Sequence, residues 1–336
     1  MTSRWKTAVG VLLSAACLVW TVRGIDVHEV SAALRDASVP LLLLAAVVAT
    51  IPFGVRARRW RTLLDPVAHH LPLGPLWRSV AIGAMITNVM PGRPGEFARA
   101  YALTRETDRV RFSAAFASIV ADRVFDAVAV LLWLLAVVAS PYFPKGALAS
   151  GSIASWIIVG VALCAAGLGA LYAIVFFPGP LLALYDRVTG RLPAKLRDRV
   201  RATIVSFTEG LGALRSPRRF AAVLAWSLVQ WLINGCAFWL AFLAVGIHAG
   251  LGAALFLQGL IALGVALPSS PGFVGVFEAL AKIGLPIFGV SQTLAVTWAV
   301  GFHLFTFLPI TLFGFYYLWR LGAGFGDISG RAGRPS

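Results

Sequence analysis

Long apolar runs alternate with short polar stretches along the chain. Six of these runs are close to the length of about 20 residues that a helix needs to cross a membrane. They predict crossings at residues 7–23, 39–55, 112–139, 152–177, 220–245 and 292–319. The first run contains a Ser14-Ala15-Ala16 sequence that resembles a signal-peptide cleavage site, but apolar sequence continues to Val22, which favours a retained span.

Two further apolar stretches differ from ordinary spans. Residues 76–90 and 251–267 each run into a Pro/Gly sequence, and the first is only about 15 residues long, which is short for a crossing. Each predicts two half-helices joined by a turn, which is a re-entrant hairpin. Because the first hairpin would enter after two crossings and the second after five, the two would be inverted relative to each other. The alternative is that both stretches are full spans joined by tight turns.

The predicted fold is therefore all-α. It is a polytopic helical membrane protein with six full transmembrane helices plus two re-entrant hairpins in an inverted repeat, or with eight transmembrane helices. A single transmembrane domain would cover residues 1–320, with repeat halves at about 27–139 and 152–319, and residues 321–336 would form a short cytoplasmic tail. Composition agrees, because 59% hydrophobic residues, 13% charged residues and a mean hydropathy of +0.83 exclude a soluble globular domain.

The basic residues indicate orientation rather than nucleic-acid binding. The formal net charge is +15, but the cations are clustered and alternate with weakly charged loops. One cluster lies between Arg187 and Arg219, and the other consists of Arg56, Arg58, Arg59 and Arg61. Because Lys and Arg are enriched in cytoplasmic loops, the pattern predicts an inner (plasma) membrane protein with both termini in the cytoplasm.

The sequence offers little for catalysis or metal binding. Cys17, Cys164 and Cys236 lie in apolar runs without paired spacing, so neither a disulfide framework nor a zinc site is expected. His69-His70 has no further ligands for a metal. No nucleophile–base pair or phosphate-binding loop is found, and we expect no cofactor, no metal and no nucleic-acid partner.

A short motif, Pro-Gly-x-x-Gly followed closely by a carboxylate, interrupts both hairpin stretches. The copies read Pro91-Gly92-Arg93-Pro94-Gly95-Glu96 and Pro271-Gly272-Phe273-Val274-Gly275-Val276-Phe277-Glu278. Pro-Gly pairs are common in ordinary loops, but a half-helix N-terminus carries partial positive charge, and arginine can bind phosphate through two N–H groups. The candidate substrate-binding residues at the breaks are Asn88, Pro91, Gly92, Arg93, Gly95, Glu96, Arg99, Ser269, Ser270, Pro271, Gly272, Gly275 and Glu278.

Three ionisable residues lie inside the predicted crossing at 112–139 and complete the candidate site. Asp122 and Asp126 are one helical turn apart and share a face, and Arg123 lies beside it. They could lock two helices together or lie at the cytoplasmic boundary. Alternatively, one aspartate holds Arg93 or Arg99, which in turn binds phosphate. His303 has no charged neighbour in sequence and is expected to be a hydrogen-bonded packing residue.

Three segments together carry a resemblance to a known family. They are Asn88 to Glu96 with Arg99, Asp122-Arg123-Val124-Phe125-Asp126, and Ser270 to Gly275 with Glu278. In this order they resemble the lysylphosphatidylglycerol synthase transmembrane (flippase-like) family. The resemblance covers most of the chain and implies movement of a charged phospholipid between leaflets, without the aminoacyl transferase. Phe273 stands where relatives often have a further glycine.

Three functional hypotheses follow. The first is a translocase, flippase-like or scramblase-like, of a phospholipid or lipid-linked substrate, so the expected partners are anionic or aminoacylated phospholipids or lipid-linked glycans. The second is a non-transporting scaffold for a lipid or glycan synthesis enzyme, which would bind the region between Arg187 and Arg219; there, residues 193–214 predict an amphipathic helix on the inner leaflet or a docking face. The third is a lipid-modifying enzyme with Glu96 or Asp122 as general base.

Overall fold

The computed structural model describes residues 17–21, 23, 27–90, 94–144, 146, 152–177, 179, 194–265 and 270–322. Pro91, Gly92, Arg93 and Ser269 of the candidate site lie outside these residues. Within them every regular element is a helix, as the apolar periodicity predicts. The chain is an all-α polytopic membrane protein.

Long helices occupy five of the predicted crossings: α3 (Val39–Leu64), α6 (Phe112–Val138), α7 (Ser152–Phe176), α10 (Pro217–Ala244) and α13 (Gln292–Arg320). Four of these five positions hold helices long and apolar enough to span a membrane. The exception is α6, which has the length but carries charged residues in its interior. Most of the predicted crossing at 7–23 lies outside the described residues. Of its described part, residues 17–21 are helical.

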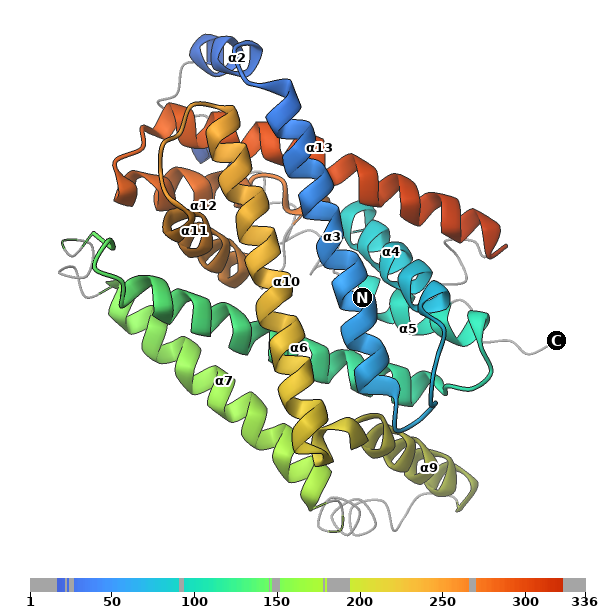
Figure 1. Ribbon diagram of the computed structural model, residues 1–336. Coiled ribbons are helices and arrows are strands. Elements are labelled where there is room, and N and C mark those ends of the chain that lie inside the picture. The colour runs from blue at the N-terminus through green and yellow to red at the C-terminus, as the bar shows by residue number, and fades with distance from the viewer. Residues whose placement is uncertain are drawn as a thin grey trace.

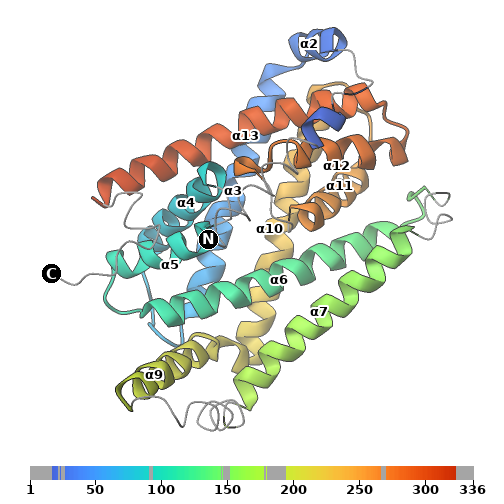
Figure 2. The same ribbon diagram turned by 180° about the vertical axis from the view of Figure 1, so that it is seen from behind.

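The helices form two pairs that hold the molecule together. α3 and α10 pack side by side through the middle of the molecule (Figure 1). Figure 2 shows the opposite side, where α6 crosses in front of that pair and α7 packs against α6. α2 (Val27–Arg35) lies at one end of the molecule and α9 (Ala194–Gly210) at the other.

The helix at the second crossing is longer than the apolar run that predicts it. α3 continues beyond residue 55 to Leu64, so the arginine cluster lies on the helix. Arginine is a good helix former, and Arg59 is fully buried, with 0% of its surface exposed. The basic cluster is therefore split between the protein interior and the surface.

Both predicted hairpins consist of short helices. α4 (Leu73–Val89) is followed by α5 (Gly95–Glu106), and α11 (Leu251–Gly264) by η3 (Pro271–Phe273) and α12 (Val276–Gly284). At about 1.5 Å per residue, each α-helix is shorter than the roughly 30 Å hydrocarbon core. The run from Pro271 through η4 (Leu285–Phe288) is as long as a span, but Gly272 and Gly275 interrupt it with φ angles of 64° and 89°. These lengths support the re-entrant alternative, whereas the inverted relation of the hairpins stays a prediction.

The predicted amphipathic helix at 193–214 is present in part. α9 covers Ala194–Gly210 and is followed by η2 (Gly212–Arg215). α9 packs against α6, where the Ser113 hydroxyl donates a hydrogen bond to Ser206 Oγ at 2.8 Å. One face of this helix is thus covered by the protein.

Two apolar cores flank the polar interior. One is aromatic and gathers Trp298, Phe238, Phe242, Phe277 and Phe302 from α10, α12 and α13. The other surrounds Trp60, Leu63 and Phe125 of α3 and α6. α3 and α10 contribute side chains to both cores, so these two helices fix the geometry of the polar residues described next.

Candidate functional site

Two buried carboxylates on α6 form the centre of the candidate site. Asp122 has 0% and Asp126 5% of its surface exposed. Burying an ionised carboxylate costs several kcal/mol unless it is paired and hydrogen-bonded. The neighbouring helices supply that pairing with arginines.

Arg59 of α3 bridges the two carboxylates. Its Nη2 lies 2.6 Å from Asp122 Oδ1, and its Nη1 lies 2.7 Å from Asp126 Oδ1. Nη1 also donates a hydrogen bond to Ser227 Oγ of α10 at 2.6 Å. One guanidinium thereby ties together α3, α6 and α10.

Arg59 is not among the predicted site residues, because the arginine cluster directly follows an apolar run and is typical of a cytoplasmic flank. A signal for it exists. The buried positions of α3 include Ala45, Ala49, Pro52 and Leu63, and continuing their three-to-four spacing beyond residue 55 places Arg59 on the same buried face.

Arg99 of α5 holds Asp122 from the other side. Its Nη1 lies 2.9 Å from Asp122 Oδ2, so the expected aspartate–arginine contact exists for Arg99. The guanidinium carbon lies 4.0 Å from the centroid of the Trp60 ring, a cation–π geometry. Trp60 is held in turn by a hydrogen bond from its Nε1 to Ser118 Oγ at 2.8 Å.

Arg123 and Glu96 form the more open edge of the cluster. Arg123 Nη2 lies 3.2 Å from Asp122 Oδ2 and 3.0 Å from Asp126 Oδ2, while its Nε lies 3.3 Å from Glu96 Oε1. The side chains of Arg123 and Glu96 are 39% and 34% exposed. This edge is where the cluster meets its surroundings.

Further donors complete the shell of Asp126. Arg56 Nη2 lies 3.6 Å from Asp126 Oδ2. Gln230 Nε2 and Trp231 Nε1 of α10 donate hydrogen bonds to Asp126 Oδ1 at 3.4 Å and 3.1 Å. Asp126 is therefore the point at which α10 joins the ionic cluster.

The cluster carries more positive than negative charge. Four arginines, Arg56, Arg59, Arg99 and Arg123, face three carboxylates, Asp122, Asp126 and Glu96. Several buried guanidinium atoms have no hydrogen-bond acceptor among the described residues, including Arg56 Nε and both Nε and Nη2 of Arg99. The surplus charge and the unused donors suit an anion.

A small cavity lies beside these unused donors. It is lined by Arg56, Arg99, Glu96, Thr87 and Gly95, among others, and has a volume of about 30 Å³, room for about one water molecule. A phosphate group does not fit this volume. The structure therefore shows the site closed.

Gly95 serves close packing between α4 and α5. A Cβ atom at Gly95 would collide with the Thr87 hydroxyl and the carbonyl oxygen of Gly83. Opposite, a Cβ at Gly83 would lie 2.7 Å from the Gly95 carbonyl oxygen. This motif glycine thus lets the two arms of the first hairpin touch along their backbones.

The second hairpin has its own polar residues. Glu278 is 5% exposed; its Oε2 accepts a hydrogen bond from Gly275 N at 2.6 Å, and its Oε1 lies 2.7 Å from His303 Nδ1. His303, which is expected to be a hydrogen-bonded packing residue and has no charged neighbour in sequence, thus has its hydrogen-bond partner on another helix. Lys282, which is not among the predicted site residues, donates from Nζ to the carbonyl oxygens of Trp20, Thr21 and Arg23 at 3.1, 2.9 and 2.7 Å.

The turn of the second hairpin explains the glycines of its motif. Gly272, Phe273 and Gly275 all have positive φ angles, of 64°, 62° and 89°. Glycine adopts this conformation without the penalty that a Cβ brings. The φ of Phe273 is therefore a physical reason why relatives often have a glycine at this position. Ser270 donates its hydroxyl to Val274 O at 2.9 Å and so stabilises the turn.

The structure brings together only part of the predicted site. Glu96, Arg99, Asp122, Arg123 and Asp126 form one cluster. Asn88 instead donates to Thr311 Oγ1 of α13 at 2.8 Å, and Ser270, Pro271, Gly272, Gly275 and Glu278 stay with the second hairpin. The two hairpins nevertheless meet, because a Cβ at Gly272 would lie 3.5 Å from the carbonyl oxygen of Asn88.

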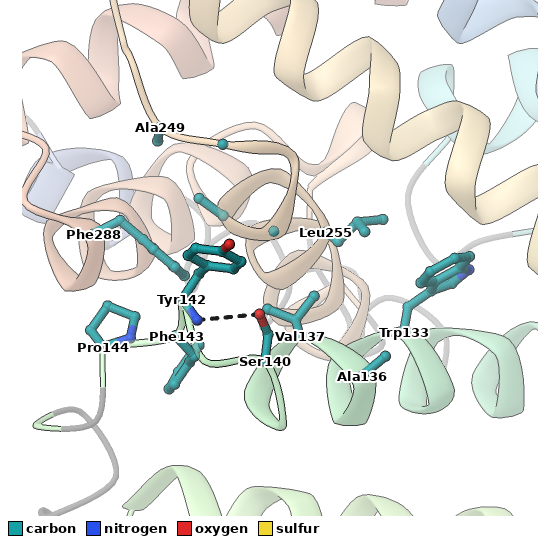
Figure 3. Close-up of a pocket in the computed structure, with 13 residues that line it drawn as sticks. Trp133, Ala136, Val137, Ser140, Tyr142, Phe143, Pro144, Ala249, Leu255 and Phe288 are labelled. Carbon is teal, nitrogen blue, oxygen red and sulfur yellow. Dashed lines mark hydrogen bonds between the residues drawn. The ribbon is translucent and has the colours of Figure 1, made fainter.

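A larger pocket lies away from the cluster, at the other end of α6. It has a volume of about 480 Å³ and is lined mainly by apolar and aromatic side chains, including Trp133, Tyr142, Phe143, Leu255 and Phe288 (Figure 3). None of its lining residues is charged. Its lining residues therefore offer no ion-pair partner for an ionic head group.

The fold and the closed ionic cluster define a polytopic helical membrane protein with a buried, arginine-rich polar centre. Residues 7–314 match the family described as "Lysylphosphatidylglycerol synthase TM region", and the chain belongs to this family. The family resemblance expected from the three motifs is confirmed.

Similar proteins occur among archaea. Two are named UPF0104 membrane protein: one from Pyrococcus horikoshii, 24% identical over 91% of this chain and 93% of the relative, and one from Methanothermobacter thermautotrophicus, 24% identical over 92% and 94%. A third, from Haloferax volcanii, is named Glycosyltransferase AglD and is 27% identical over 83% of this chain. This chain spans about half of AglD, since the match covers 48% of that protein.

Proposed function

We propose that this protein translocates a phospholipid or lipid-linked substrate with a phosphate head group between the leaflets of the inner membrane, with both termini in the cytoplasm. The observation that carries the proposal is the ionic cluster between the first hairpin and α3. Its positive surplus and its unused Arg99 donors face a small polar cavity. An ionic group is costly in hydrocarbon, and such a centre lowers this cost by replacing water as the hydrogen-bonding partner.

The aspartates have a defined part in this proposal. Without Asp122 and Asp126, the buried guanidinium groups of Arg59 and Arg99 would have no carboxylate partner among the described residues. With them, the resting site is nearly neutral, and a phosphate that enters competes with Asp122 for Arg99. Because the cavity is too small for that group, substrate entry requires the α4–α5 hairpin to move away from α3 and α6.

The substrate class is supported by family membership and by one relative. The family description concerns a lipid-aminoacylating enzyme's membrane region, which favours an anionic or aminoacylated phospholipid. The name of AglD concerns glycosyl transfer, which favours a lipid-linked glycan. Both carry phosphate next to the lipid, and the Arg99 side of the cluster suits that shared group.

Translocation can be tested in proteoliposomes. Head-group-labelled phosphatidylglycerol, lysyl-phosphatidylglycerol and a polyprenyl-phosphate-linked sugar are each reconstituted with wild type and with Arg99→Gln, and an impermeant quencher reports the outer-leaflet fraction over time. We expect wild type to move at least one substrate. Arg99→Gln should move that substrate at least about tenfold more slowly, because a charge-assisted hydrogen bond is lost.

The matched control is Arg105→Gln. Arg105 lies on the same helix, α5, but is exposed, so its replacement removes the same charge outside the cluster and should leave the rate unchanged. Thermal unfolding of each variant in detergent checks folding. An Arg99→Gln protein that is folded and moves lipid at the wild-type rate would contradict the proposal.

The scaffold hypothesis predicts the opposite dependence. α9 lies at one end of the molecule with Arg201, Ala202 and Thr203 exposed, a surface available to a soluble partner. If folded wild type moves none of the substrates, and cellular function is lost with Arg201→Glu but not with Arg99→Gln, the scaffold replaces the translocase.

A further inference from the structure

We infer that the surface pocket between the ends of α3 and α10 binds the phosphate group of an anionic phospholipid lying in the adjacent leaflet. The inference concerns binding alone and does not depend on translocation. The pocket has a volume of about 680 Å³ and is lined by Arg58, Arg61, Arg218, Arg219, Asp65 and Trp226, among others. It is distinct from the buried cluster, because none of these side chains contacts Asp122 or Asp126 in an ion pair among the described residues.

The pocket has an excess of unpaired positive charge. Its one carboxylate, Asp65, is already paired with Arg219 at 2.9 Å. Arg58, Arg61 and Arg218 take part in no ion pair of the described residues. Arg58 is held in place, with its guanidinium carbon 5.7 Å from the Trp226 ring centroid and a 3.3 Å hydrogen bond to Thr62 Oγ1.

The backbone at the pocket favours an anion as well. α10 begins here, with Ser216 as N-cap accepting a hydrogen bond from Arg219 N. A helix N-terminus carries partial positive charge. It adds to the guanidinium groups, so two separate features of the pocket attract a phosphate.

The position along α3 identifies the anion as part of a lipid. Val47, Ile51, Gly54, Arg58 and Arg61 follow one another at three-to-four spacing and form one stripe of the helix. Val47 and Ile51 are 63% and 48% exposed, as expected for side chains against acyl chains. A lipid whose tails lie on Val47 and Ile51 therefore has its head group at Arg58 and Arg61.

α10 shows the same order of apolar and basic residues. Val229, Trp226, Ala222 and Arg218 form one stripe, running from the middle of the helix to its N-terminus. Val229 is 42% exposed, and tryptophan is enriched at the level of lipid head groups. A soluble anion would need only the charges, whereas this apolar-to-basic order on both helices suits a phospholipid.

Native mass spectrometry of the full chain, released from micelles containing phosphatidylglycerol or phosphatidylcholine at stated ratios, tests the inference. We expect retained phosphatidylglycerol on wild type and about 30-fold weaker retention on the Arg58→Gln/Arg61→Gln double variant, since two cationic contacts are lost. The matched control is the Arg105→Gln/Arg320→Gln double variant, because Arg105 and Arg320 are exposed and lie outside the pocket. This variant should retain phosphatidylglycerol like wild type. If the double variant does not fold, Arg218→Gln, at an exposed position, is measured instead and should bind several-fold more weakly.

Two results would overturn the inference. One is equal retention of phosphatidylglycerol by wild type and by the folded pocket variants. The other is displacement of the lipid by millimolar inorganic phosphate as effectively as by phosphatidylglycerol, which would make the pocket a site for soluble anions. Stronger retention of phosphatidylglycerol than of phosphatidylcholine, lost only in the pocket variants, supports it.

Discussion

The two hairpins carry similar motifs but use their carboxylates differently. In the first hairpin, Glu96 is partly exposed and faces Arg123 of α6. In the second, Glu278 is buried, accepts a hydrogen bond from Gly275 N at the start of its own helix and contacts His303 of α13. One acid faces an arginine on a neighbouring helix, whereas the other caps its own helix.

The spacing between glycine and acid accounts for the difference. Glu96 directly follows Gly95 and lies in the first turn of α5, where its side chain points toward α6. Glu278 is three residues after the N-cap Gly275, the position from which a glutamate reaches back to the N-cap N–H. A shared Pro-Gly-x-x-Gly pattern therefore predicts a turn, while the spacing between the glycine and the acid determines which groups the acid contacts.

The largest effect is expected from removing Arg59, the arginine of α3 at the centre of the ionic cluster that the first hairpin contacts. Arg59→Met leaves two buried aspartates without their bridging partner, and we expect the free energy of unfolding to fall by about 3 to 5 kcal/mol. Thermal unfolding in detergent measures this. The adjacent Arg58→Met, at a half-buried position outside the cluster, should change stability by less than about 0.5 kcal/mol. Equal effects of the two substitutions would contradict a central role for Arg59.

Alanine substitutions at Gly95 and Gly275 should destabilise the two hairpins for different physical reasons. Gly95→Ala places a methyl group against backbone and hydroxyl atoms of α4, so we expect a loss of about 2 to 3 kcal/mol from overpacking. Gly275→Ala meets a φ of 89° instead and should lose about 1 to 2 kcal/mol from backbone strain. The measurement is thermal unfolding of both variants.

A control glycine lies on α7. Gly169 has open space around it, and because alanine favours helix over glycine, Gly169→Ala should be neutral or slightly stabilising. If Gly95→Ala proved as well tolerated as Gly169→Ala, the close contact of α4 and α5 would not be needed.

The Glu278–His303 contact can be isolated by a double-mutant cycle. Glu278→Gln keeps an oxygen for Gly275 N but loses the charge next to His303, and we expect a loss of about 1 kcal/mol. His303→Phe removes the same contact from the other side. The double variant should cost about 0.5 to 1 kcal/mol less than the sum of the single changes. Strict additivity would show that the two side chains do not interact.

The smallest effect is expected at the surface pair of Asp65 and Arg219. Partial burial raises the pKa of Asp65, but the hydrogen bond and charge of Arg219, together with His69, outweigh burial and hold that pKa below its usual value. The stabilisation is therefore present above the usual pKa of an aspartate and is lost as the pH falls through the lowered value in the folded state. Because the side chains are 29% and 35% exposed, Asp65→Asn should cost less than about 1 kcal/mol at pH 7.

That pH dependence has a simple check. The stability difference between wild type and Asp65→Asn is measured at pH 7 and at pH 3, where the carboxyl is increasingly protonated. We expect the difference to shrink at the lower pH, and a difference that grew there would contradict the assigned sign.

The membrane class and most helix positions follow from the sequence, since apolar length alone predicts α7, α10 and α13. The interior of the site does not. The contact of Arg59 with Asp126 joins residues 67 positions apart, and that of Glu278 with His303 joins residues 25 positions apart. Periodicity shows which face of a helix is buried, but the partner on the other helix depends on how helices cross. The binding roles of the candidate residues stay predictions.

The hydrogen bonds from Lys282 to the segment near residue 20 determine when that segment can reach its final position during synthesis. Its ammonium group meets the carbonyl oxygens of Trp20, Thr21 and Arg23, which precede it by 262, 261 and 259 positions. At roughly 5 to 20 residues per second, a ribosome needs on the order of 10 to 50 s to reach Lys282 after making these residues. Throughout that interval the segment near residue 20 lacks its contact with the Lys282 ammonium group, so this contact forms late in synthesis.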